Sequence, residues 1–215
     1  MASYSDNFNR SDSGSLGANW TDDVNGWEIA SNRAVGLNVE YDFTRYTGSD
    51  LDSIDHEVEA EIHVDGGSNK HGGIGARQNA TLTFYLLGYM DESVGAGYEL
   101  HRIISGGSTL IDSAASGSGN KRLRLVVDGS SQEGYVEDVL EVFDDDTLIT
   151  SGVQSSVVCS EGNGRIDNFS AWDLLASVIV TPSAISAVVG RINPTVIHGS
   201  IIITPTAAGG LAVTI

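Results

Sequence analysis

A strict alternation of apolar and polar residues between positions 57 and 64 sets the fold class of this chain. One side of the pattern carries the apolar residues Val58, Ala60, Ile62 and Val64, and the other carries Glu57, Glu59, Glu61 and His63. Successive side chains of a β-strand point to opposite faces, so this segment is predicted to be a strand with one buried face and one solvated face.

Similar short runs recur along the chain, and turns rich in Gly, Asn, Asp and Ser separate them. No amphipathic segment of helical period is longer than about two turns. The other predicted strands are 27–30, 34–37, 73–77, 82–89, 98–105, 108–113, 121–128, 135–143, 146–151 and 164–174. So many short antiparallel strands indicate an all-β, two-sheet sandwich.

Charge and cysteine content exclude several classes of function. Asp and Glu outnumber Lys and Arg by 29 to 11, and this acidic surface should repel nucleic acids. Cys159 is the only cysteine, so no intrachain disulfide is possible, and we expect it to be a small buried residue. The start of the chain has neither a basic nor an apolar run. We therefore expect no secretory signal and folding in the reducing cytoplasm of a host.

The last forty residues differ from the rest, because Arg191 is the only Lys, Arg, Asp or Glu between 176 and 215. The unit S-V-I-V-T-P at Ser177 recurs as S-I-I-I-T-P at Ser200. Proline and glycine interrupt each apolar stretch before the roughly 20 residues of a membrane span. Unpaired apolar strands aggregate in water, so 176–215 is predicted to be a β-rich assembly arm after a sandwich at 1–175. Its predicted contact residues are Val178, Ile179, Val180, Pro182, Ile201, Ile202, Ile203 and Pro205.

Four motifs near the start are Asp6-Asn7-Phe8-Asn9-Arg10, Leu16-Gly17-Ala18-Asn19-Trp20, Gly26-Trp27-Glu28-Ile29 and Asn32-Arg33-Ala34. Later landmarks are Gly75-Ala76-Arg77, Tyr98-Glu99-Leu100, Leu123-Arg124-Leu125-Val126 and Arg165-Ile166-Asp167-Asn168-Phe169. Together, over about residues 3–174, these motifs resemble concanavalin-like (laminin-G-like) jelly-roll domains. If the first and last strands of such a sandwich pair, Phe8 and Phe169 become neighbours, with Trp20, Trp27 and Trp172 in the core.

The paired T-P units also resemble the tails of tailed-bacteriophage structural proteins. That resemblance implies a non-enzymatic virion protein, first of all a capsid decoration protein. Its arm would bind the major capsid protein or sister subunits, by analogy as a trimer, while the jelly roll projects outward. One alternative is a minor tail or fibre protein that binds host-surface glycan. Another is a carbohydrate-binding module or glycosidase-related domain, because this fold supports many activities.

No residue is predicted to be catalytic or to bind a cofactor or metal. Glu57, Glu59 and Glu61 depart from the E-x-D-x-x-E pattern of jelly-roll hydrolases, and their alternation is typical of a solvated face. The runs at 22–23 and 144–146 lack the spaced ligands of an EF-hand, which leaves calcium a minor alternative. The histidines lack zinc-motif spacing; they are His56, His63, His71, His101 and His198. Tyrosines that either fill the core or stack on sugars are Tyr41, Tyr46, Tyr85, Tyr89 and Tyr98.

Overall fold

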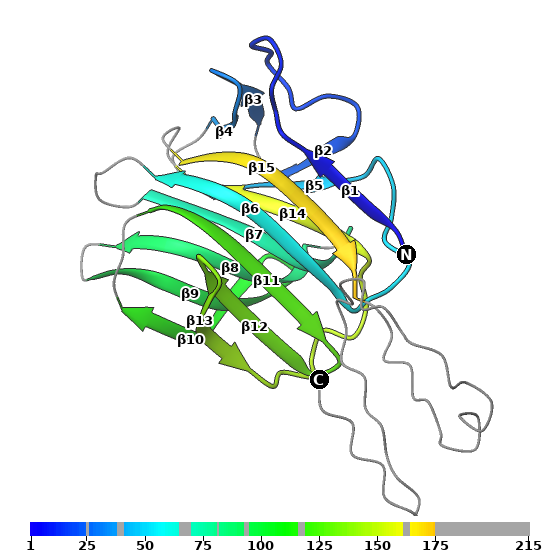
Figure 1. Ribbon diagram of the computed structural model, residues 1–215, viewed down its shortest axis with the longest axis vertical. Coiled ribbons are helices and arrows are strands. Elements are labelled where there is room, and N and C mark those ends of the chain that lie inside the picture. The colour runs from blue at the N-terminus through cyan, green and yellow to red at the C-terminus, as the bar shows by residue number, and fades with distance from the viewer. Residues whose placement is uncertain are drawn as a thin grey trace, which may run out of the picture. The chain divides into compact units, whose positions relative to one another are not determined.

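The computed structural model describes residues 1–24, 26–37, 41–64, 70–80, 82–92, 95–115, 119–160 and 164–174. In this part of the chain all regular secondary structure is β, and the strands form two antiparallel sheets packed as a jelly-roll sandwich (Figure 1). Sheet A consists of β1 (Ser3–Asp6), β3 (Trp27–Ile29), β4 (Ala34–Gly36), β6 (His56–Val64), β11 (Asn120–Asp128), β12 (Ser131–Val136), β13 (Val139–Asp144) and β15 (Gly164–Asp173). Sheet B consists of β2 (Trp20–Val24), β5 (Asp42–Tyr46), β7 (Lys70–Asn79), β8 (Thr83–Glu92), β9 (Gly95–Ile104), β10 (Gly107–Ala115) and β14 (Gln154–Cys159).

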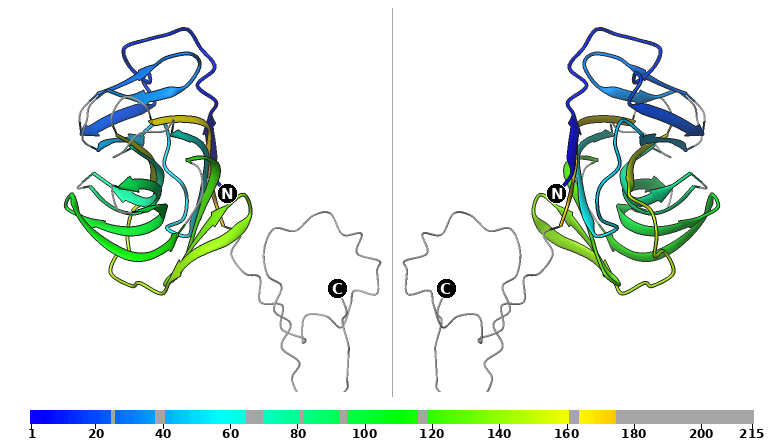
Figure 2. Two further views of the ribbon diagram at one scale, coloured as in Figure 1. Left: turned by 90° about the vertical axis from the view of Figure 1, so that its left-hand side faces the viewer. Right: turned by 90° about the vertical axis from the view of Figure 1, so that its right-hand side faces the viewer.

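The strand order brings distant parts of the chain together. Sheet A runs β13-β12-β11-β6-β15-β4-β3, with β1 also paired to β15, and sheet B runs β10-β9-β8-β7-β14-β5-β2. Figure 2 shows the two sheets from the side as separate layers. The first strand lies beside the last, with Ser3 opposite Trp172 and Asp6 opposite Phe169. This pairing of the first and last strands is the condition under which Phe8 and Phe169 were expected to be neighbours.

The core between the sheets follows the alternation seen in the sequence. In β6 the residues Val58, Ala60 and Ile62 are at most 1% exposed, whereas the three glutamates between and beside them remain partly exposed. At the end near β1, the ring of Trp20 lies 5.6 Å from that of Phe8 and 5.0 Å from that of Phe169. Trp20 therefore joins the two phenylalanines that were expected to be neighbours.

Three local predictions were wrong. The single strand expected at 135–143 is two strands, because Glu137 and Asp138 turn the chain with φ values of 50° and 66°. No strand forms at 146–151; there the Asp146 carboxylate accepts the N–H of Leu148 at 2.7 Å, a local bond that competes with strand pairing. Trp172 is only partly buried, since its neighbours in β15 take the two inward positions.

The patterning missed four strands, β1, β2, β5 and β14, of which β14 and β5 lie inside sheet B between β7 and β2. Residues 1–173 form one compact unit. The predicted arm at 176–215, with Val178 and the other predicted contact residues, lies outside the described residues and stays a prediction. Among the residues that the structure describes, no helix has the length and hydropathy needed to cross a membrane.

Candidate functional site

The glutamates of β6 lie on the outer face of sheet A, where arginines of the neighbouring β11 neutralise two of them. Arg124 Nη1 lies 3.3 Å from Glu57 Oε1, and Arg122 Nη1 lies 3.4 Å from Glu59 Oε2. Arg124 also stacks over the Tyr135 ring at 3.9 Å. The two carboxylates of a glycosidase lie on either side of a cleft that holds the substrate. On this face Glu57 and Glu59 are instead paired with arginines of the neighbouring strand. The expectation of a solvated, charged face agrees with this arrangement.

The acidic runs provide internal ion-pair partners. Asp23 accepts the Nε–H of Arg45 at 2.9 Å and Nε2–H of Gln78 at 2.7 Å, while burial raises its pKa. Asp146 pairs with Arg102. Burial acts to raise the pKa of Asp146, but the Leu148 N–H and Arg102 outweigh it, so this pKa lies below its usual value.

Cys159 and His56 are both completely buried. Burial raises the pKa of the Cys159 thiol, as expected for a small packed residue. His56 lies at the start of β6, where its Nε2 accepts the N–H of Arg77 at 3.1 Å. Both side chains are enclosed within the sandwich.

The outer face of sheet B, turned away from sheet A, combines apolar and polar side chains in two cross-strand rows. The first row, from β9 to β5, is His101, Leu86, Gly75, Ser156 and Arg45. The second row is Glu99, Gly88, Gly73, Val158 and Phe43. Directly opposed residues in a sheet point to the same side, so all of these residues belong to one face.

Glycines in the middle of this face let apolar side chains lie close against the backbone. A Cβ placed on Gly75 would come within 2.8 Å of the Phe84 ring, and one on Gly88 within 2.8 Å of Met90 Cε. These side chains belong to a small apolar cluster, separate from the main core. Its fully buried members are Phe84, Leu86, Met90, Ile103 and Val158. The centre of this face is therefore buried, and its partly exposed side chains lie at its two ends, on β9 and β5.

Two aromatic rings at one side of the cluster remain partly exposed. Tyr41 stacks on His71 with ring centroids 4.8 Å apart, and Phe43 contacts the Phe84 ring edge-on at 5.6 Å. Of the five tyrosines considered from the sequence, Tyr41 is the one whose partly exposed ring lies beside this apolar cluster. The other four are buried: Tyr46, Tyr85, Tyr89 and Tyr98. For those four, the expectation of a core role holds.

Polar groups held by hydrogen bonds flank the apolar cluster on both sides. On β9, Glu99 Oε2 lies 2.6 Å from His101 Nε2, and the other ring nitrogen of His101 lies 2.9 Å from the Ser108 hydroxyl. On β5, Arg45 binds Asp23 through Nε and the Gln154 side-chain oxygen through Nη1, both at 2.9 Å. The sequence alone did not single out this combination, because its members come from five strands.

No protein-family model matches this chain, and no curated protein matches it. Solved structures resemble it in fold. Carbohydrate binding module CBM66 from Bacillus subtilis has a TM-score of 0.57 and 15% identity, covering 74% of this chain and 95% of that one. The CBM2 module of the evolved Dit of Lactobacillus casei BL23 phage J-1 has a TM-score of 0.55 and 9% identity, with coverages of 81% and 96%.

A longer protein with the same fold, the GH43 BlXynB protein from Bacillus licheniformis, has a TM-score of 0.55 and 12% identity. The match covers 78% of this chain but 38% of that one. The two carbohydrate-binding modules, in contrast, are matched over nearly their whole length. At these identities the likeness establishes the fold, a jelly-roll sandwich of the kind seen in carbohydrate-binding modules.

Proposed function

We propose that this chain is a non-catalytic carbohydrate-binding module and that the outer face of sheet B binds the sugar. One observation carries the proposal: partly exposed aromatic rings lie on the same face as polar groups already fixed by neighbours. The aromatic rings are Tyr41 and Phe43, and the polar groups are Glu99, His101 and Arg45. The fold similarity to two carbohydrate-binding modules supports the same conclusion.

The chemistry of this face suits an oligosaccharide, because β5 and β9 are separated by three strands of sheet B, a distance of roughly 19 Å. The apolar side of a pyranose or furanose packs on aromatic rings, and its hydroxyls need paired donors and acceptors. On β5, Arg45 keeps further guanidinium N–H groups as donors beyond those that bind Asp23 and Gln154. On β9, Glu99 supplies an acceptor, and His101, whose two ring nitrogens contact Glu99 and Ser108, holds it in place. Because these side chains are held before binding, less conformational entropy is lost when sugar arrives.

Binding to an array of bacterial cell-surface polysaccharides, followed by calorimetry on the hits, tests the proposal. Phe43→Ala should weaken binding about tenfold through the loss of one ring contact, and His101→Ala about tenfold through the loss of the contact that holds Glu99 in place. Phe143→Ala is the matched control, because Phe143 is an exposed phenylalanine on β13 of the other sheet. Binding that survives both variants, or that Phe143→Ala removes, contradicts the assignment of this face.

Within this proposal, the chain acts in a phage tail or fibre, where its jelly roll binds host-surface glycan. The repeated T-P units of the arm at 176–215 support a virion role, and a module of a phage Dit has a similar fold. The copy number in purified particles tests the location. A handful of copies per particle fits a tail or fibre protein. Absence from particles contradicts any virion role.

Capsid decoration is the second candidate, favoured by the acidic net charge of −18 and by the apolar arm. In that role hundreds of copies would bind the major capsid protein through Val178, Ile179 and the rest of the arm, with sugar binding absent. Deleting 176–215 tests the arm as the anchor. The truncated sandwich should stay folded but no longer attach to particles, and attachment at full occupancy would show that the arm is not the anchor. Sugar binding by the truncated sandwich favours the first proposal over capsid decoration.

A further inference from the structure

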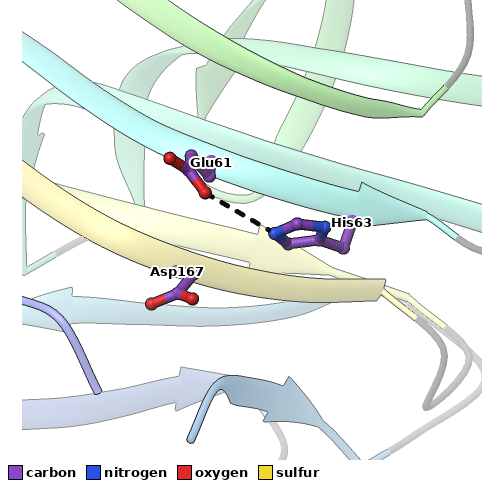
Figure 3. A group of neighbouring side chains, drawn as sticks. All are labelled: Glu61, His63 and Asp167. Atoms are coloured by element: carbon purple, nitrogen blue, oxygen red, sulfur yellow. Dashed lines mark ion pairs between the residues drawn. The ribbon is translucent and has the colours of Figure 1, made fainter. Parts of the chain in front are cut away.

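Three potential metal ligands converge on the outer face of sheet A, on the opposite side of the sandwich from the proposed sugar-binding face. Glu61 and His63 come from β6 and Asp167 from the adjacent β15 (Figure 3). One ligand atom from each residue lies within 4.8 Å of the other two. The sheet creates this group, because Asp167 is the direct cross-strand partner of Glu61 and His63 follows Glu61 on the same side.

The electrostatics of this group favour a cation. Glu61 and Asp167 place two carboxylates directly opposite each other, and like charges in that position destabilise a sheet. Two arginines flank the group in register, Arg122 opposite Glu61 and Arg165 opposite His63, and Arg122 pairs with Glu59 and Asp138. Two ion-pair contacts of the group are long: Arg33 Nε is 3.8 Å from Asp167 Oδ2, and the His63 imidazole Nε2 is 3.8 Å from Glu61 Oε2. Both separations exceed hydrogen-bond length, so an ion with shorter bonds to the oxygens competes well with them.

We propose that Glu61, His63 and Asp167 bind one divalent transition-metal ion, such as Zn²⁺, Mn²⁺ or Co²⁺. An imidazole nitrogen with two carboxylate oxygens suits these ions, whereas calcium prefers six to eight oxygens. Ligands around such an ion lie roughly 3–3.5 Å apart. Side-chain rotation closes the difference from 4.8 Å, because Glu61 is 44% exposed and free to move. Three protein ligands leave positions on the ion for water.

A second Glu-x-His pair on sheet B provides an internal comparison. Glu99 and His101 have the same spacing as Glu61 and His63, and their side chains lie closer, at 2.6 Å. The group that accompanies Glu99 and His101, however, is the hydroxyl of Ser108, whereas Glu61 and His63 are accompanied by the carboxylate of Asp167. Spacing along one strand therefore does not create the site. The carboxylate from the neighbouring strand, Asp167, distinguishes the two pairs.

Metal titration of the full-length protein after treatment with a chelator tests the proposal. Zn²⁺ binding is measured by calorimetry, and Co²⁺ binding by the visible absorption bands that report imidazole and carboxylate ligands. We expect one ion per sandwich at this site and weaker binding of calcium. His63→Ala and the near-isosteric Asp167→Asn should each weaken Zn²⁺ binding about tenfold or more. His101→Ala should leave it unchanged.

The outcomes separate this proposal from the sugar-binding proposal. His63→Ala should lose metal and keep sugar binding, while His101→Ala should lose sugar binding and keep metal. Circular dichroism of each variant shows whether the sandwich is still folded. If the folded His63→Ala and Asp167→Asn variants bind Zn²⁺ as the unmodified chain does, or if the unmodified chain does not bind it, the metal site is wrong.

Discussion

His56 gives the sandwich a stability that should depend on pH in a defined window. The ring is completely buried, and its Nε2 accepts the N–H of Arg77 at 3.1 Å while Nδ1 lies 3.3 Å from the Ser53 carbonyl oxygen. This arrangement requires the neutral tautomer with the proton on Nδ1, because a proton on Nε2 would oppose the Arg77 N–H. Burial, with a further contribution from the Arg77 charge, lowers the pKa of His56 to about 4.

The direction in which stability changes with pH follows from comparing proton binding by the folded and unfolded states. In the unfolded chain the pKa of His56 is 6.5, so between pH 6.5 and 4 the unfolded state binds a proton that the folded state does not. Stability is therefore fully present above pH 6.5 and falls as the pH falls through this window. The free energy of unfolding should drop by about 1.4 kcal/mol at pH 5.5 and about 2.6 kcal/mol at pH 4.5.

Urea unfolding at pH 7.5, 6.5, 5.5 and 4.5 measures this effect, with His56→Gln as the reference protein. The 29 Asp and Glu residues also titrate near the acid end, and they contribute almost equally to both proteins. The difference between the two free energies of unfolding then isolates His56. A difference that stays flat from pH 7.5 to 4.5 refutes the argument. So does an NMR titration in which the His56 ring protonates near pH 6.5.

Three further predictions concern packing. Gly75→Ala should destabilise the sandwich by about 1–3 kcal/mol, because the new Cβ would collide with the Ser156 hydroxyl. Gly14→Ala should change the stability little, because nothing lies within 4 Å of its new Cβ, and thermal melts compare the two variants. Arg77→Met should cost about 3 kcal/mol or more in urea unfolding, since the buried guanidinium donates to three backbone carbonyls; a cost below 1 kcal/mol contradicts that role. Cys159, with its raised pKa, should not react with a thiol reagent until denaturant unfolds the chain, and rapid labelling of the native protein would show that the thiol is accessible.

Much of the sandwich could be predicted from local patterns. The alternation at 57–64 fixed which residues of β6 are buried, because side chains of a strand alternate regardless of its neighbours. The motifs around Phe8, Trp20 and Phe169 indicated the jelly roll and the meeting of its two ends. The predictions of a strand at 146–151 and of an unbroken strand across 137–138 were wrong, because short aspartate-rich stretches form local turns as readily as strands.

The candidate sites, in contrast, depend on the register between strands. The sequence determined that Glu61 and His63 share one side of a strand, but nothing in its spacing places Asp167 beside them, about a hundred residues away. The sequence likewise gave no reason to group Glu99 and His101, which lie on β9, with Arg45, which lies on β5. Side-chain alternation is a property of one strand, whereas cross-strand neighbours are set by packing of the whole sandwich. For this reason the local pattern is enough to predict which faces are polar, whereas the grouping of polar residues from different strands follows from the packing and register of the sheets.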